Sequence, residues 1–210
     1  MDERTGDRID GSVPGQTPLD PDERRGLLRP EAIITRRQLN LAQAANILKA
    51  QYKYLAGPVS ARAAPFDESW MRRLHREMLG DVWDWAGRYR TTEKNIGVAS
   101  YEIATAVLAV CDEVPVRRDS GMSWRERGVL LHHGAVFIHP FANGNGRWSR
   151  MATNIWLRRR KQPVVLWPEQ TMGESSVARC DYFSAIRAAD QFDYGPLTRL
   201  HARYTEPARK

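Results

Sequence analysis

Apolar residues recur every three to four positions through most of the chain, and this spacing predicts a mainly α-helical fold. Side chains at that interval share one face of a helix, where they can pack against other helices. Thr35 and Asp67 stand where N-caps are expected, and Gly57-Pro58 is a stop signal. The helices are predicted over residues 36–55, 67–80, 102–112, 123–138, 145–160, 175–190 and 196–204.

Two segments lack the helical period. Residues 83–100 are irregular, with a short β-hairpin predicted within them, and residues 163–168 are bounded by prolines and predict a loop or a strand stub. Trp148, Trp156 and Phe137 fall in the helical pattern and are predicted to be core residues. The pattern therefore predicts a compact helical bundle with a small β-hairpin.

Composition divides the chain into three parts. Residues 1–30 contain many Gly, Pro, Asp and Arg residues and few large apolar ones, which predicts an extended N-terminal arm. Residues 31–65 form a predicted N-terminal helical segment, and residues 66–210 hold the main domain. A chain of 210 residues has room for one domain with a sizeable core plus an extension.

Several absences in the sequence bear on where the protein works. No apolar run approaches the length that crosses a bilayer, and the start, Met-Asp-Glu-Arg, has no apolar core of a secretory signal. The two cysteines, Cys111 and Cys180, provide no disulfide framework. These features favour a cytoplasmic protein that does not enter a membrane.

The chain is basic, with a net charge of +7 and a pI near 9.7. Such a charge favours an acidic partner or non-specific contact with nucleic acid. The basic residues form no continuous stripe, however, and the sequence has neither zinc-ligand spacing nor an RNA-binding aromatic signature. A dedicated nucleic-acid role is therefore disfavoured, and an acidic protein surface is an equally good partner.

Polar chemistry concentrates in residues 139–150, where a lone imidazole, a Gly/Asn-rich turn and two arginines follow one another. Gly144 and Gly146 allow backbone conformations that other residues avoid, and a turn of this kind at a helix start presents unpaired N–H groups to an anion. Arg147 and Arg150 fall on the first helical turn, where a cation costs about 0.3–1 kcal/mol. A bound polyphosphate is a reason to keep them there.

His139 precedes this turn and is the candidate general base. An imidazole titrates near pH ~6.5 and can accept a proton at neutral pH. A histidine after an apolar run is often only a buried core residue, and a Gly/Asn turn is often a plain connector. The presence of all these elements within residues 139–150 favours a site that binds phosphates beside a proton acceptor.

The other histidines carry weaker signals. His132 and His133 are neighbours in a predicted helix, where adjacent side chains point apart, so metal chelation by this pair is disfavoured. His75 and His201 have no companions in the sequence and are interpreted as structural or exposed residues.

The segment 139–150 resembles the signature of the Fic (Fic/Doc) family, His-x-Phe-x-Asp/Glu-Gly-Asn-Gly-Arg-x-x-Arg, and matches it at every fixed position except Asn143. Residues 74–79 and 83–90 are similar to the family's approach to its flap hairpin, and residues 179–185 to its C-terminal helix. The resemblance covers roughly residues 66–200. Residues 17–23 and 46–48 are also similar to a subgroup labelled mobile mystery protein B.

The resemblance implies a compact helical Fic-type fold that transfers AMP from ATP to a Ser, Thr or Tyr hydroxyl of a protein. It implies that His139 is the general base and that Phe141 anchors the loop. The nucleotide would be bound by Gly144, Asn145, Gly146, Arg147, Arg150 and Tyr182, and an extended target segment by the flap residues Asn95, Ile96, Gly97 and Val98.

Asn143 stands where the family usually has the Asp or Glu that binds Mg²⁺. Mg²⁺ is usually held by one or two carboxylates together with substrate phosphates. An Asn side chain keeps an oxygen ligand but loses the negative charge. The sequence therefore predicts a weak metal site, in which the ATP phosphates carry most of the coordination.

Regulation is the last expectation that the resemblance raises. Many Fic proteins carry an inhibitory helix, Ser/Thr-x-x-x-Glu-Gly/Asn, whose Glu pairs with the second arginine of the motif. No Glu in this chain is followed by Gly or Asn. The chain is therefore predicted to lack this inhibitory glutamate. An antitoxin-like protein is a candidate inhibitor in trans. A homo-oligomer is also compatible with the sequence.

The function predicted from the sequence is protein adenylylation. Two alternatives stay open. One is the transfer of another phosphate-containing group, and the other is a nucleotide-binding regulatory module with little catalysis, because Asn143 replaces the metal-binding carboxylate.

Overall fold

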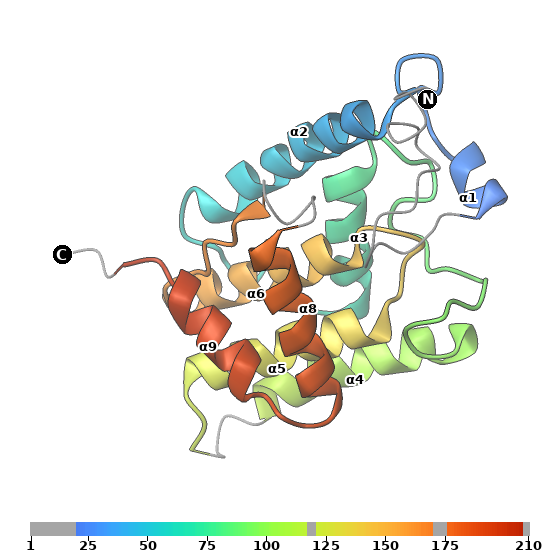
Figure 1. Ribbon diagram of the computed structural model, residues 1–210. Helices are drawn as coiled ribbons and strands as arrows, with labels where there is room; N and C mark the ends of the chain where they lie inside the picture. The colour runs from blue at the N-terminus through green and yellow to red at the C-terminus, as the bar shows by residue number, and fades with distance from the viewer. Residues whose placement is uncertain (1–19, 117–120, 170–175, 208–210) are drawn as a thin grey trace.

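The computed structural model describes residues 20–116, 121–169 and 176–207 (Figure 1). They form a bundle of α-helices, which confirms the predicted fold class. The helices are α1 (Pro21–Arg25), α2 (Arg36–Leu55), α3 (Glu68–Leu79), α4 (Ile103–Val116), α5 (Trp124–Ile138), α6 (Asn145–Arg159), α8 (Val177–Asp190) and α9 (Gly195–Tyr204), with a 3-10 turn, η1 (Ser100–Glu102), before α4.

Capping residues start the helices where the sequence predicts. The Thr35 hydroxyl accepts from the Gln38 N–H at the start of α2, and the Asp67 carboxylate accepts from the Trp70 N–H at 2.7 Å at the start of α3. Each bond satisfies an N–H group that has no partner inside its helix. The predicted ends agree with the structure to within a few residues.

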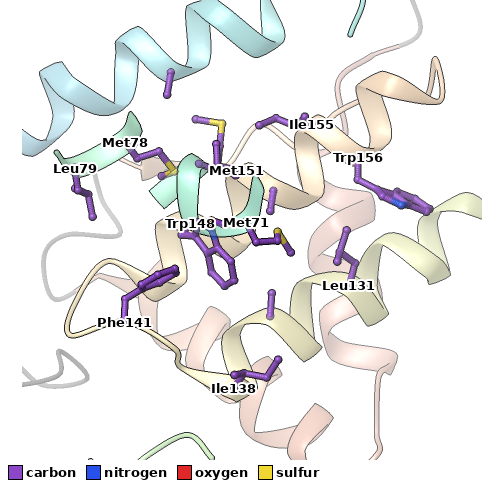
Figure 2. Close-up of a cluster of buried hydrophobic side chains, with 14 of the residues drawn as sticks. Met71, Met78, Leu79, Leu131, Ile138, Phe141, Trp148, Met151, Ile155 and Trp156 are labelled. Atoms are coloured by element: carbon purple, nitrogen blue, oxygen red, sulfur yellow. Dashed lines mark hydrogen bonds between the residues drawn. The ribbon is translucent and has the colours of Figure 1, made fainter. Parts of the chain in front are cut away.

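Helix α6 lies at the centre of the bundle and contacts α2, α3 and α5 (Figure 1). Its Trp148 and Ile155 are fully buried. The Trp148 indole lies close to Phe141 and Met71, and its N–H donates to the Met71 carbonyl at 3.0 Å (Figure 2). Because α6 is enclosed by its neighbours, its N-terminus has a fixed position in the molecule.

The predicted β-hairpin does not form. In the described ranges the only β-pairings are two isolated bridges, Leu27 with Trp83 and Val165 with Thr205, and residues 91–99 contain no strand. The physical reason is Arg90. Its guanidinium donates to the carbonyls of Thr92 and Val98, so these groups are satisfied by a side chain and not by a partner strand.

The expected N-terminal arm is partly helical. Residues 1–19 lie outside the described residues, but α1 follows at Pro21–Arg25, and the Asp84 N–H donates to the Gly26 carbonyl at 2.9 Å. Lys94 donates to the Asp20 and Glu23 carboxylates at 2.9 and 2.8 Å. Residues 20–26 are therefore docked beside the loop of residues 91–99, and the extended arm stays a prediction for residues 1–19.

Three smaller expectations complete the comparison. Trp148 and Trp156 are buried as predicted, whereas Phe137 is 49% exposed because it lies on the outer face of α5. Cys111 and Cys180 are both free thiols. None of the helices in the described ranges is at once long enough and apolar enough to cross a membrane.

Candidate functional site

The motif turn connects the buried end of α5 to the start of α6. His139 ends α5 in the left-handed conformation, with φ 52°, and Gly144 precedes α6 with φ 81°. A Cβ atom on Gly144 would lie 2.5 Å from the Leu79 side chain, so only glycine fits here. The N-cap residue of α6, Gly144, makes no side-chain capping bond. The N–H groups of this turn point out of the helix start, which is the arrangement of an anion site.

His139 is neutral and has a defined tautomer. Its Nδ1 lies 3.3 Å from the Val136 carbonyl, which can only accept, so Nδ1 carries the proton and Nε2 carries the lone pair. Burial lowers the pKa of His139 to about 4, with further lowering by the charges of Arg90 and Lys94. The imidazole is therefore unprotonated at neutral pH, as a general base must be.

Arg147 is held by two neutral amides. Its Nη1 donates to the Gln43 Oε1 of α2 at 2.7 Å, and its Nη2 approaches the Asn143 Oδ1 at 3.3 Å. Burial lowers the pKa of this guanidinium to about 10. Within the described residues no ion pair joins Arg147 to a carboxylate, and the Glu169 carboxylate acts on its charge only from a distance.

Arg150 differs from Arg147, because it forms an ion pair with a carboxylate. Its Nε and Nη2 donate to the two oxygens of Glu169 at 2.7 and 2.6 Å. Burial disfavours the charge, but the Glu169 carboxylate outweighs burial and raises the pKa of Arg150. Sequence reasoning missed Glu169, because this residue follows α6 and does not belong to the inhibitory pattern.

Asn145 and Phe141 hold the turn together. The Asn145 amide accepts from the Phe141 N–H at 2.9 Å and donates to the Phe141 carbonyl at 2.8 Å. The side chain of Asn145 is thus committed to the loop backbone, although the sequence predicts a role at the phosphates. The Phe141 ring is buried and stacks on His75 at 3.7 Å between centroids.

His75 supports the same turn from α3. Its Nδ1 accepts from the Gly87 N–H at 3.0 Å, so its Nε2 carries the proton and donates to the Asn143 carbonyl at 3.0 Å. Burial lowers the pKa of His75 to about 3, which keeps it neutral. The spacing of this residue in the sequence gives no sign of the contact, since its partners lie 12 and 68 positions away.

Asn143 does not present a metal site by itself. The residue is 7% exposed and its side-chain oxygen faces the Arg147 guanidinium, which is an unfavourable neighbour for a cation. In the part of the chain that the structure describes, no group of three His, Cys, Asp or Glu residues could hold a metal ion. The residues present therefore do not fit a Mg²⁺ ion held by the protein alone.

Tyr182 of α8 lies beside Arg150 and is part of a buried polar chain. Its hydroxyl lies 3.0 Å from the Nε2 of His132, and the Nδ1 of His132 lies 2.9 Å from the Nε2 of His201. Arg150 lies over the Tyr182 ring at 5.2 Å. A Cβ atom on Gly146 would lie 3.9 Å from the Tyr182 hydroxyl, so this hydroxyl borders the N-terminus of α6.

The flap residues lie next to His139. The Val98 N–H donates to the Ile138 carbonyl at 3.3 Å, and the Arg90 Nε donates to the His139 carbonyl at 2.8 Å. Gly97 has φ 92°, and a Cβ atom there would lie 2.6 Å from the His139 Cβ. Asn95 and Ile96 are exposed beside this contact. The structure thus brings the predicted flap and the predicted base together.

Comparisons with known proteins agree with this geometry. Residues 65–157 match the sequence model of the Fic/DOC family. "Protein adenylyltransferase fic-1" of Caenorhabditis briggsae is 29% identical over 138 residues, which cover 63% of this chain and 26% of the relative. "Protein adenylyltransferase Fic" of Nematostella vectensis is 31% identical over 138 residues, which cover 63% of this chain and 31% of the relative. The matched region thus spans less than a third of these relatives.

Solved structures show the same fold. Fic-1 (residues 134–508) from C. elegans superposes with a TM-score of 0.63 at 22% identity, covering 92% of this chain and 51% of that one. The N-terminal Fic domain of a cell filamentation protein from Bartonella quintana, solved with bound ADP, has a TM-score of 0.65 at 17% identity and covers 89% and 97%. Residues 65–157 of the chain therefore match the Fic/DOC family, and the fold of the chain is that of the solved Fic domains.

Proposed function

We propose that this protein transfers AMP from ATP to the hydroxyl of a Ser, Thr or Tyr side chain in a target protein. The observation that carries the proposal is the motif turn itself, which has the neutral imidazole of His139 at the end of α5 and an N-cap without a side-chain cap bond, Gly144, at the start of α6. The names of the relatives, protein adenylyltransferases, support the same reaction.

The proposed reaction divides its work among the residues of the turn. The α- and β-phosphates of ATP bind at the N–H groups of Gly144, Asn145 and Gly146, and Arg147 binds the phosphates beyond them. His139 Nε2 removes the proton of the incoming hydroxyl while its oxygen attacks the α-phosphorus. The bond from the α-phosphorus to the bridging oxygen breaks, and pyrophosphate leaves. Little covalent work falls on the protein, so positioning and charge dominate.

The low pKa of His139 fits this proposal in one respect. It ensures the free-base form before substrate binds, although a base with a pKa of about 4 is a weak proton acceptor at neutral pH. The negative phosphates of a bound nucleotide favour the imidazolium and raise this pKa toward the working range. The proposal therefore assigns ATP a second role, since its charge activates the base.

The target segment is proposed to bind along the loop of Asn95, Ile96, Gly97 and Val98. An extended peptide can pair with the backbone of the exposed residues Asn95 and Ile96, since the N–H and the carbonyl of Val98 are already bonded to Ile138 and Arg90. Because Gly97 packs on His139, a hydroxyl held at this loop is presented to the base. Tyr182 is proposed to line the nucleotide on the opposite side, next to Arg150.

Mg²⁺ enters the proposal only as a companion of the ATP phosphates. Asn143 is the residue that would face it, with an amide oxygen in place of a carboxylate. Replacing Asn143→Asp should lower the Mg²⁺ concentration needed for half-maximal transfer, because a charged ligand binds a hard cation better. An unchanged Mg²⁺ dependence would remove Asn143 from the metal's surroundings.

Regulation is proposed to act on Arg150. Glu169 must leave this arginine before a phosphate can take its place. We also propose a toxin–antitoxin arrangement, in which an inhibitor protein acts in trans. The proposed setting is the cytoplasm, and the proposed subgroup is mobile mystery protein B.

The alternative from another class is a nucleotide-binding module with little catalysis. Two observations favour it, the missing carboxylate at Asn143 and the occupied Arg150. Incubation of the protein and a cell lysate with ATP labelled at the α- or the γ-phosphate separates these readings. Transfer of the α-label to protein supports AMP transfer, transfer of the γ-label alone indicates kinase-like chemistry, and binding without transfer indicates the module.

A further inference from the structure

Gln43 connects the N-terminal helix to the motif. It lies on α2, outside residues 65–157, and is 2% exposed. Its Oε1 accepts from the Nη1 of Arg147 at 2.7 Å, across 104 positions of sequence. Helix α2 thus places an amide against the first arginine of the motif.

An amide at this position leaves the arginine charged. Gln43 and Asn143 each use one N–H of Arg147, and neither contributes a negative charge. Arg150 differs, since Glu169 binds it through two oxygens. An arginine has five N–H donors in a fixed plane, so Arg147 keeps three for a ligand while its plane is held by the two amides.

The other half of the Gln43 amide has an unused donor. Its Nε2 is buried without a hydrogen-bond partner among the described residues. Buried donors are normally satisfied, and an orphan of this kind calls for an explanation. Because both atoms belong to one amide, the Nε2 lies near the Arg147 guanidinium, where an anion would supply the missing acceptor.

We propose that Gln43 is a positioning residue of the phosphate site, which holds the Arg147 guanidinium in place without neutralising it. The inference rests on the proposed nucleotide function of the same turn. It adds that α2, although outside the matched domain, sets the affinity for polyphosphate. The chemical class of ligand is a nucleoside triphosphate or its inorganic triphosphate part.

The substitution Gln43→Glu tests this idea with almost no change of shape. A Glu at this position pairs with Arg147 and competes with phosphate. A second variant, Gln43→Ala, removes the acceptor and frees the guanidinium plane. The control is Gln51→Glu, which adds the same charge to α2 about 12 Å further along the helix. Titration calorimetry of the full chain with ATP and with inorganic triphosphate measures affinity, and thermal unfolding measures stability.

We expect Gln43→Glu to weaken the binding of both ligands at least tenfold without lowering the unfolding temperature, and Gln43→Ala to weaken it severalfold. Gln51→Glu should bind as the wild type does. If the contact is purely structural, Gln43→Glu binds triphosphate with the affinity of the wild type and is equally stable. This result overturns the inference. If Gln43→Glu does not fold, wild-type affinity in Gln43→Ala overturns it.

The two claims fail in different ways. A wild-type protein that binds neither ATP nor triphosphate contradicts the proposed function, and the inference falls with it. A wild-type protein that binds both, with Gln43→Glu unchanged, leaves the function standing and removes only Gln43. An equal loss in Gln51→Glu would show a general charge effect and also removes Gln43 from the site.

Discussion

At the scale of single residues, the site is defined by the different hydrogen-bond partners of Arg147 and Arg150. Arg147 faces two amides, whereas Arg150 is bound at both ends of its fork by Glu169. The motif predicts both arginines as phosphate ligands. What it could not predict are their partners, because Gln43 and Glu169 reach the turn from other segments of the chain.

Replacing Glu169→Gln should raise the affinity for ATP. The variant keeps the size of the side chain but removes the charge that competes with phosphate for Arg150, and a bidentate carboxylate on a buried arginine is a strong competitor. We expect the Kd for ATP to fall severalfold, measured by titration calorimetry. The control is Glu206→Gln, which removes a carboxylate paired with Arg158, away from the turn. An unchanged Kd for Glu169→Gln would mean that the ion pair opens without cost.

At the scale of elements, the ends of helices and the loop beside them carry the function. The helices could be predicted because caps and apolar spacing are local signals, as at Thr35 and Asp67. The loop of residues 91–99 could not, because Arg90 satisfies its carbonyls from the side and thereby replaces the predicted hairpin. The contact of His75 with the turn could not be predicted either, because it depends on packing between segments that are distant in the sequence.

The substitution Gly97→Ala should detach this loop from the base. A Cβ atom at Gly97 would meet the His139 Cβ at 2.6 Å, and φ 92° is unfavourable for alanine. We expect faster hydrogen exchange at the Val98 amide, which donates to the Ile138 carbonyl, and a loss of transfer to protein. Gly121→Ala is the matched control, because Gly121 also has a positive φ, 71°, but its Cβ would meet nothing within 4 Å. Equal exchange in both variants would mean that the contact with His139 does not hold the loop.

At the scale of the whole molecule, the bundle encloses neutral histidines that bear on stability. Burial lowers the pKa of His75 and of His201 to about 3. An unfolded chain titrates its histidines near pH ~6.5 and so binds more protons than the folded one below that pH. The stabilising effect of these groups is therefore fully present above pH ~6.5 and is lost as the pH falls toward 3.

This linkage gives a measurable slope. Between pH ~6 and ~4, each such histidine should remove up to about 1.4 kcal/mol of unfolding free energy per pH unit. Urea unfolding of the wild type across this range should show the loss, and His75→Gln should show a shallower slope. The same slope in both proteins would indicate that His75 is protonated in the folded state.

The proposed reaction depends on His139 as its base, and one comparison tests this proposal most directly. Wild-type protein and His139→Ala are incubated with a lysate and ATP labelled at the α-phosphate, and ATP affinity is measured separately for both. We predict that the wild type labels protein, that His139→Ala does not, and that their ATP affinities agree within about twofold, since the base acts on the hydroxyl and not on nucleotide binding. Label transfer by His139→Ala at the wild-type rate would contradict the account.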